Sequence, residues 1–87
     1  MRFTMLGRKG RIRMSRLKKY HGKCEEPADR GTSDVILDTS LRGRRELETI
    51  IHELQHFASW HHEEAYVKDV SRAMADVLWR WGYRKQL

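Results

Sequence analysis

The stretch RRELETIIHELQHFAS, residues 44–59, decides the fold because its apolar residues recur at intervals of three and four. Such spacing lines up side chains along one face of an α-helix. The aligned positions are Leu47, Ile50, Ile51, Leu54, Phe57 and Ala58. We predict a helix over residues 44–59, with its N-cap at Ser40 or a residue shortly after it. Glu46 and Glu48 then lie near the positive end of the helix dipole.

Shorter elements are expected before this helix. The run DVILDTSL, residues 34–41, is rich in β-branched side chains and ends in turn residues, which predicts a strand. Residues 21–33 contain Gly22, Pro27 and Gly31 and are expected to form an irregular loop. Nearer the N-terminus, a short alternation of apolar and basic residues favours a hairpin or an extended arm.

A second apolar period predicts another helix over residues 61–82, ended by Gly82. Its expected buried stripe consists of Tyr66, Val67, Val70, Met74, Val77, Leu78 and Trp81. Strand-forming segments followed by two helices are typical of an α+β fold. We therefore predict one domain over residues 1–87, in which a small antiparallel sheet or hairpin packs on the two helices.

The composition limits the kinds of protein that this chain can be. Eighty-seven residues, of which 39% are hydrophobic and 34% charged, form one small core, so we expect any substrate to lie in a surface groove. The single cysteine, Cys24, excludes an internal disulfide and favours a reducing compartment. Nothing in the apolar pattern predicts a signal peptide or a membrane span. We therefore expect a soluble, cytoplasmic protein without a membrane partner.

The positive charge is concentrated in the first quarter of the chain. Residues 1–24 hold nine Lys and Arg residues and no acid, whereas the rest of the chain holds nine basic and twelve acidic residues. A basic segment of this kind can bind nucleic-acid phosphates, and a solvated strand face explains the same pattern. The candidate nucleic-acid contacts are Arg8, Lys9, Arg11 and Arg13.

The segment HELQH within the first helix has the pattern of a metal site. His52 and His56 are four residues apart, so both imidazoles project from one face of the helix at a separation that suits a single zinc ion. Glu53 follows the first histidine directly, beside the open coordination position. There it can act as general base and then as general acid toward a zinc-activated water.

Catalytic zinc usually has three protein ligands, so a third must be found. His62 is ten residues after His52, the spacing of the extended metzincin motif, although Ser59 replaces the glycine of that motif. Glu63 and Glu64 both fall in the first turn of the second helix, which lies beside the histidines if that helix folds back. Helical phase alone leaves the three candidates open.

The chain resembles a group of very small zincin-like proteins encoded largely by bacteriophages and their hosts. The resemblance lies in the order of HGKCEEP, DVILDTSL, RRELETIIHELQHFASW, HEEAYV and LWRWGYR, over about two thirds of the chain. A more distant similarity, limited to HExxH and a preceding strand, connects it to the ImmA/IrrE and SprT-type proteins. The resemblance implies a minimal zincin fold, with Glu64 as the third zinc ligand after His52 and His56.

The motif and the resemblance together predict a zinc-dependent metallopeptidase of a phage or its bacterial host. In this hypothesis Glu53 is the catalytic base, and the exposed edge of the 34–41 strand aligns an extended peptide or protein substrate. Two alternatives belong to other classes of protein. One is a nucleic-acid-associated module with a structural zinc ion, and the other is an inactive zincin-like interaction protein.

Overall fold

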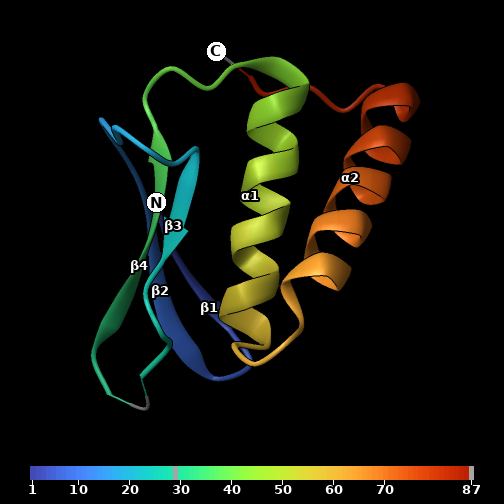
Figure 1. The fold of residues 1–87 in the computed structure, drawn as a ribbon. Coiled ribbons are helices and arrows are strands. Elements are labelled where there is room, and N and C mark those ends of the chain that lie inside the picture. Colours follow the sequence, from blue (N-terminus) through green and yellow to red (C-terminus); the bar gives the residue numbers. More distant parts are fainter. Residues whose placement is uncertain (29, 87) are drawn as a thin grey trace.

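The computed structural model describes residues 1–28 and 30–86, which form four strands followed by two helices (Figure 1). The elements are β1 (Arg2–Met5), β2 (Arg8–Ser15), β3 (Gly22–Cys24), β4 (Thr32–Asp38), α1 (Gly43–Ala58) and α2 (Glu64–Trp81). The predicted α+β class is confirmed. The first helix lies within one residue of its predicted bounds, whereas the second begins three residues later than predicted.

The sheet is mixed, which corrects the prediction of a purely antiparallel one. The strand order is β1-β2-β4-β3, and β4 pairs parallel with β2 but antiparallel with β3. Strand β4 therefore pairs with β2 on one side and with β3 on the other, so it is an interior strand of the sheet. The expected exposed edge at residues 34–41 is therefore wrong. The open edge on that side is β3, which lies inside the segment predicted as an irregular loop.

The predicted N-terminal hairpin is confirmed by the antiparallel pairing of β1 with β2. Leu6 and Gly7 form its turn, both with a positive φ, as two-residue hairpin turns require. The ring of Phe3 lies over Gly10 and packs edge-on against Phe57 of α1, with 4.9 Å between the ring centroids. This contact joins the hairpin to the helix that carries HELQH.

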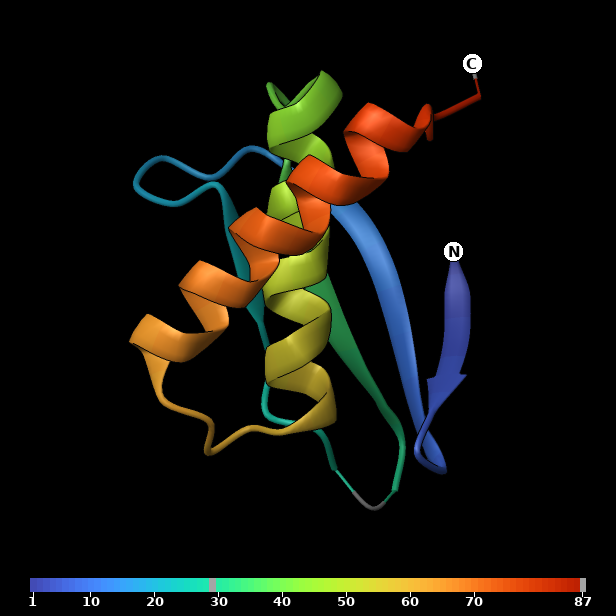
Figure 2. The ribbon, with the colours of Figure 1, turned by 90° about the vertical axis from the view of Figure 1, so that its right-hand side faces the viewer.

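Helix α1 lies between the sheet and α2, so the molecule has three layers (Figures 1 and 2). On one side α1 packs against β3 and β4, and on the other side it packs against α2. The buried apolar residues are Val35, Ile36, Leu37, Leu41, Phe57, Val67 and Ala75. Within the described residues, neither helix combines the length and apolarity that crossing a bilayer requires.

Helix α2 contacts α1 through a different face from the one predicted. The residues that it buries are small or medium in size: Val67, Ser71 and Ala75. Trp81, expected in the core, is 81% exposed, and Tyr66 is 55% exposed. The helix ends at Gly82 as predicted, with a left-handed φ of 109° that only glycine adopts readily. The N-cap position of the first helix is Arg42, two residues after Ser40, and its side chain makes no capping hydrogen bond.

Candidate metal centre

Three of the predicted ligand side chains converge where the start of α2 meets the last turns of α1. The Nε2 atoms of His52 and His56 lie 2.8 Å from the two carboxylate oxygens of Glu64, one from each. One ligand atom from each residue can be chosen so that all three lie within 4.8 Å of one another. The fold therefore brings together the two histidines of the motif and the acid twelve residues after the first.

The donor atoms in this cluster suit a zinc ion. Two imidazole nitrogens and one carboxylate are a common catalytic ligand set, and atoms bound to one tetrahedral zinc ion at about 2.0–2.1 Å lie about 3.3 Å apart. The two histidines contact different oxygens of Glu64 at 2.8 Å, and the three ligand atoms lie within 4.8 Å of one another, so sharing one ion requires shifts of about 0.5–1.5 Å. Glu64 lies at the exposed start of α2, so the movement of its own side chain requires no repacking of the core.

Glu53 is buried beside the cluster and has an unusual environment for a carboxylate. Its residue is only 7% exposed, and its Oε2 has no hydrogen-bond partner among the described residues. Burial raises the pKa of Glu53 above its ordinary value, while the nearby His52 and His56 act in the opposite direction. A buried carboxylate with a raised pKa beside a donor cluster is typical of a general acid or base.

A cleft of about 500 Å³ lies next to the cluster. Its lining residues are Tyr20, Gly22, Lys23, Cys24, Glu53, His56, Trp60, His62 and Glu64. A larger apolar groove, of about 700 Å³, lies along the N-terminal half of α1 and contains none of the candidate ligands. We therefore place the candidate site in the smaller cleft, which is lined by Glu53, His56 and Glu64.

Strand β3 forms one wall of this cleft and exposes part of its backbone there. The Glu25 N–H donates to the carbonyl of Asp34, and the Asp38 N–H donates to the carbonyl of His21. In an antiparallel pair, alternate residues bond to the neighbouring strand, so the backbone groups of Gly22 and Cys24 point away from β4. The open edge of β3 can therefore accept an extended chain beside the cluster.

The two alternative ligands lie close to the cluster but are not part of it. Glu63 is the exposed N-cap residue of α2. His62 donates its backbone N–H to the carbonyl of Ser59, and its ring packs against Tyr66 at a centroid distance of 5.3 Å. His62 also lines the cleft, so its side chain is placed to contact a substrate instead of the ion.

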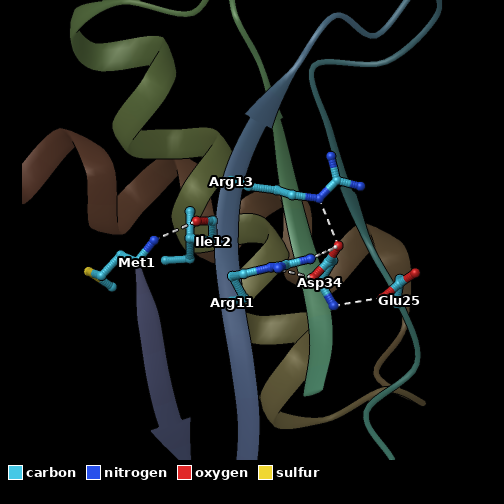
Figure 3. Close-up of polar contacts among 6 residues, drawn as sticks. All are labelled: Met1, Arg11, Ile12, Arg13, Glu25 and Asp34. Carbon is cyan, nitrogen blue, oxygen red and sulfur yellow. Dashed lines mark hydrogen bonds and ion pairs between the residues drawn. The ribbon is translucent and has the colours of Figure 1, made fainter. Parts of the chain in front are cut away.

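The four candidate nucleic-acid contacts, Arg8, Lys9, Arg11 and Arg13, lie on β2, and none of them lines the cleft. Figure 3 shows that Arg11 and Arg13 both reach Asp34 on β4, at 3.1 and 2.7 Å. The hydrogen bonds from both guanidinium groups hold the pKa of Asp34 below its ordinary value. Arg8 and Lys9 lie at the start of β2. Two of the four predicted nucleic-acid contacts therefore already share an acidic partner.

The prediction from sequence missed the β3 wall of the cleft. Gly22 was the available signal, because a glycine inside a strand often marks a close approach of another element. A Cβ at Gly22 would lie 3.0 Å from the Cγ of Glu53, which shows how closely β3 passes the predicted base. Cys24 also lines the cleft, and burial raises the pKa of its thiol to about 12.

Comparison with known proteins adds no family assignment. No family model, curated protein or solved structure matches this chain. The resemblance to small zincin-like proteins therefore stays a hypothesis, and functional inference must start from the His52, His56 and Glu64 cluster itself.

Proposed function

We propose that the protein is a zinc-dependent metallopeptidase of minimal zincin type. The observation that carries this proposal is the convergence of His52, His56 and Glu64 beside the buried Glu53, whose Oε2 has no hydrogen-bond partner among the described residues. A structural zinc site needs four closed ligands, whereas three ligands and a nearby titratable acid are characteristic of a catalytic one. An intracellular location is part of the proposal, because Cys24 is a free thiol.

The chemistry divides between the ion and the side chains of this chain. A bound zinc ion supplies Lewis-acid polarisation of water and of a peptide carbonyl. Glu53 accepts the proton of the attacking water as its oxygen bonds to the carbonyl carbon, and then delivers it to the amide nitrogen as the C–N bond breaks. The raised pKa of Glu53 brings its two protonation states closer in free energy, which favours both transfers.

The substrate proposed for this site is an extended peptide segment aligned on β3. The backbone groups of Gly22 and Cys24 supply the hydrogen bonds, and the open cleft leaves room for side chains of different sizes. Strand β4 cannot serve, because both of its edges are paired. This moves the predicted β-augmentation from residues 34–41 to residues 22–24.

The test is hydrolysis of an internally quenched peptide library by the zinc-loaded protein. We expect cleavage that a chelator abolishes and added zinc restores. Glu53→Gln should lower kcat by about 100-fold or more while zinc remains bound. Glu48→Gln, which changes an acid on the same helix outside the cluster, is the matched control and should retain full activity. Zinc-loaded protein that cleaves no library member would refute the proposed activity.

Nucleic-acid binding is not our first proposal for the basic hairpin. Asp34 neutralises part of the charge of Arg11 and Arg13, so the field of this surface is weaker than the sequence alone indicates. DNA binding by the basic hairpin can be distinguished from activity at the metal centre. Binding through phosphates falls steeply as the salt concentration rises, and it should survive Glu53→Gln.

A further inference from the structure

Helix α2 exposes more large apolar side chains than it buries. Val77 is 62% exposed and Met74 is 49% exposed, in addition to Tyr66 and Trp81. Val70, between them, is only partly buried. The side chains that pack against α1 are smaller, and one of them, Ser71, accepts a hydrogen bond from Gln55. An exposed series of this kind on a small protein indicates an interaction surface.

These exposed residues form one continuous stripe. The exposed stripe consists of Tyr66, Val70, Met74, Val77 and Trp81. Intervals of four, four, three and four residues keep the side chains on one line of the helix, about 100° from the face that contacts α1. At 1.5 Å per residue the stripe is about 22 Å long, enough for a helix of equal length to lie along it.

The apolar residues of the stripe are spaced almost symmetrically about the middle of the helix. Tyr66 and Trp81 are equally far from a midpoint between Ala73 and Met74, and so are Val70 and Val77. An antiparallel copy of the same helix therefore presents an apolar residue opposite every apolar residue. This self-complementarity is what a twofold, isologous interface requires.

We propose that a second copy of this chain covers the stripe, through antiparallel packing of α2 against α2. Tyr66 then faces Trp81 of the second copy, and Val70 faces Val77 of the second copy. Met74 packs near the twofold axis. Both copies bury their stripes, and because each stripe lies about 100° from the face that contacts α1, the two α1 helices lie side by side on one side of the α2 pair.

The charges beside the stripe support the antiparallel direction. Asp69 lies on the solvent flank of the stripe near its start, and Arg80 lies on the same flank near its end. Arg80 also forms an exposed ion pair with Asp76 of its own chain, at 3.3 Å through Nη1, which leaves other guanidinium N–H groups for a second acid. In an antiparallel pair this flank meets its own copy, so Asp69 of each chain lies within about 3 Å, along the axis, of Arg80 of the other. In a parallel pair related by a twofold axis, this flank would instead face the opposite flank of the copy, and Asp69 would not meet Arg80. Within one chain the two residues are eleven positions apart, about 16 Å, and make no contact through the helix.

The proposed dimer also stabilises the first turn of α2, which carries Glu64 of the candidate metal centre. Tyr66 is two residues after Glu64, so Trp81 of the second copy packs against the first turn of α2. The N-cap residue of α2, Glu63, makes no side-chain hydrogen bond to the N–H groups of that turn. The proposal nevertheless stands independently of zinc or peptidase activity, because it rests on the stripe and its flank.

The experiment is the molar mass in solution, measured by sedimentation equilibrium over a wide range of concentrations. We expect a monomer–dimer equilibrium for the wild type. Val77→Asp should raise the dimer dissociation constant by about 100-fold or more, because it buries two unpaired carboxylates. Arg72→Asp, on an exposed face of α2 away from the stripe, is the matched control and should leave dimerisation nearly unchanged. A wild type that stays monomeric at every concentration would overturn the proposal.

A charge exchange tests the antiparallel register directly. Asp69→Arg and Arg80→Asp should each weaken the dimer by about tenfold, and the double variant should recover most of that loss. Recovery can arise only between chains, because the two positions do not meet within one helix. Circular dichroism of each variant checks folding. Losses that add without recovery, or a dimer that survives Val77→Asp, would show that the interface lies elsewhere.

Discussion

Replacing Gly22 with alanine should test how β3 positions the candidate base. A Cβ at this residue would lie 2.7 Å from the Cγ2 of Thr49 and 3.0 Å from the Cγ of Glu53. Ordinary contacts between carbon atoms are about 3.5–4.0 Å, so β3 and α1 must separate by about 1 Å. The backbone of Gly22 does not have a positive φ, so this clash is the only cost of the substitution.

Two measurements follow from that displacement. We expect Gly22→Ala to lower the free energy of unfolding by about 1–3 kcal/mol in urea denaturation, as other overpacked cores do. If the protein is a peptidase, kcat should fall by about 100-fold, because a 1 Å misplacement of a catalytic group has effects of that size. The zinc content should remain, since the three ligand residues are not touched.

Thr49→Ser separates the two contacts made by the new methyl group. It removes the nearer carbon and keeps the hydroxyl that donates to the carbonyl of Arg45. Combined with Gly22→Ala, it should recover much of the lost stability, while activity stays low because the contact with Glu53 persists. Lys9→Ala, a change at an exposed residue of β2 that does not line the cleft, is the control. A Gly22→Ala protein with unchanged stability and activity would refute this account of the cleft.

Three further predictions concern other parts of the molecule. Gly10→Ala should displace the Phe3 ring and lower the free energy of unfolding by about 1–3 kcal/mol in urea. Hydrogen bonds from the Ser40 hydroxyl and backbone N–H groups lower the pKa of Asp38 to about 2, so its stabilising contribution should be lost as pH falls from about 4 to about 2; Asp38→Asn should flatten that part of the unfolding profile. The pKa of Cys24, about 12, predicts slow alkylation by iodoacetamide at neutral pH in the native state and fast alkylation in urea.

The first helix was predictable from sequence because its signal is local. Apolar residues at helical spacing define α1, and HELQH places both imidazoles on one of its faces whatever else the chain does. The convergence of Glu64 with them depended on the direction of α2, which phase does not determine. The structure supplies that direction and places Glu64, instead of the adjacent Glu63, against the two histidines.

The sheet and the buried face of α2 were harder to predict, because both depend on partners distant in sequence. Strand β3 has only three residues, too few to show alternation, and the parallel pairing of β4 with β2 leaves no local signal. Helix α2 has two apolar faces. The larger residues, such as Trp81, dominate the periodicity, whereas close packing on α1 selects the smaller ones, such as Ser71 and Ala75.

The most direct test of the central claim is the zinc content of the purified protein, determined by elemental analysis after exposure to zinc and removal of the excess. We predict one zinc ion per chain in the wild type and in Glu53→Gln, and none in His56→Ala. Glu64→Gln should bind zinc more weakly, whereas Glu63→Gln, which changes the adjacent acid, should match the wild type. A wild type that retains no zinc, or a Glu64→Gln protein that binds it as tightly as the wild type, would contradict the proposed metal centre.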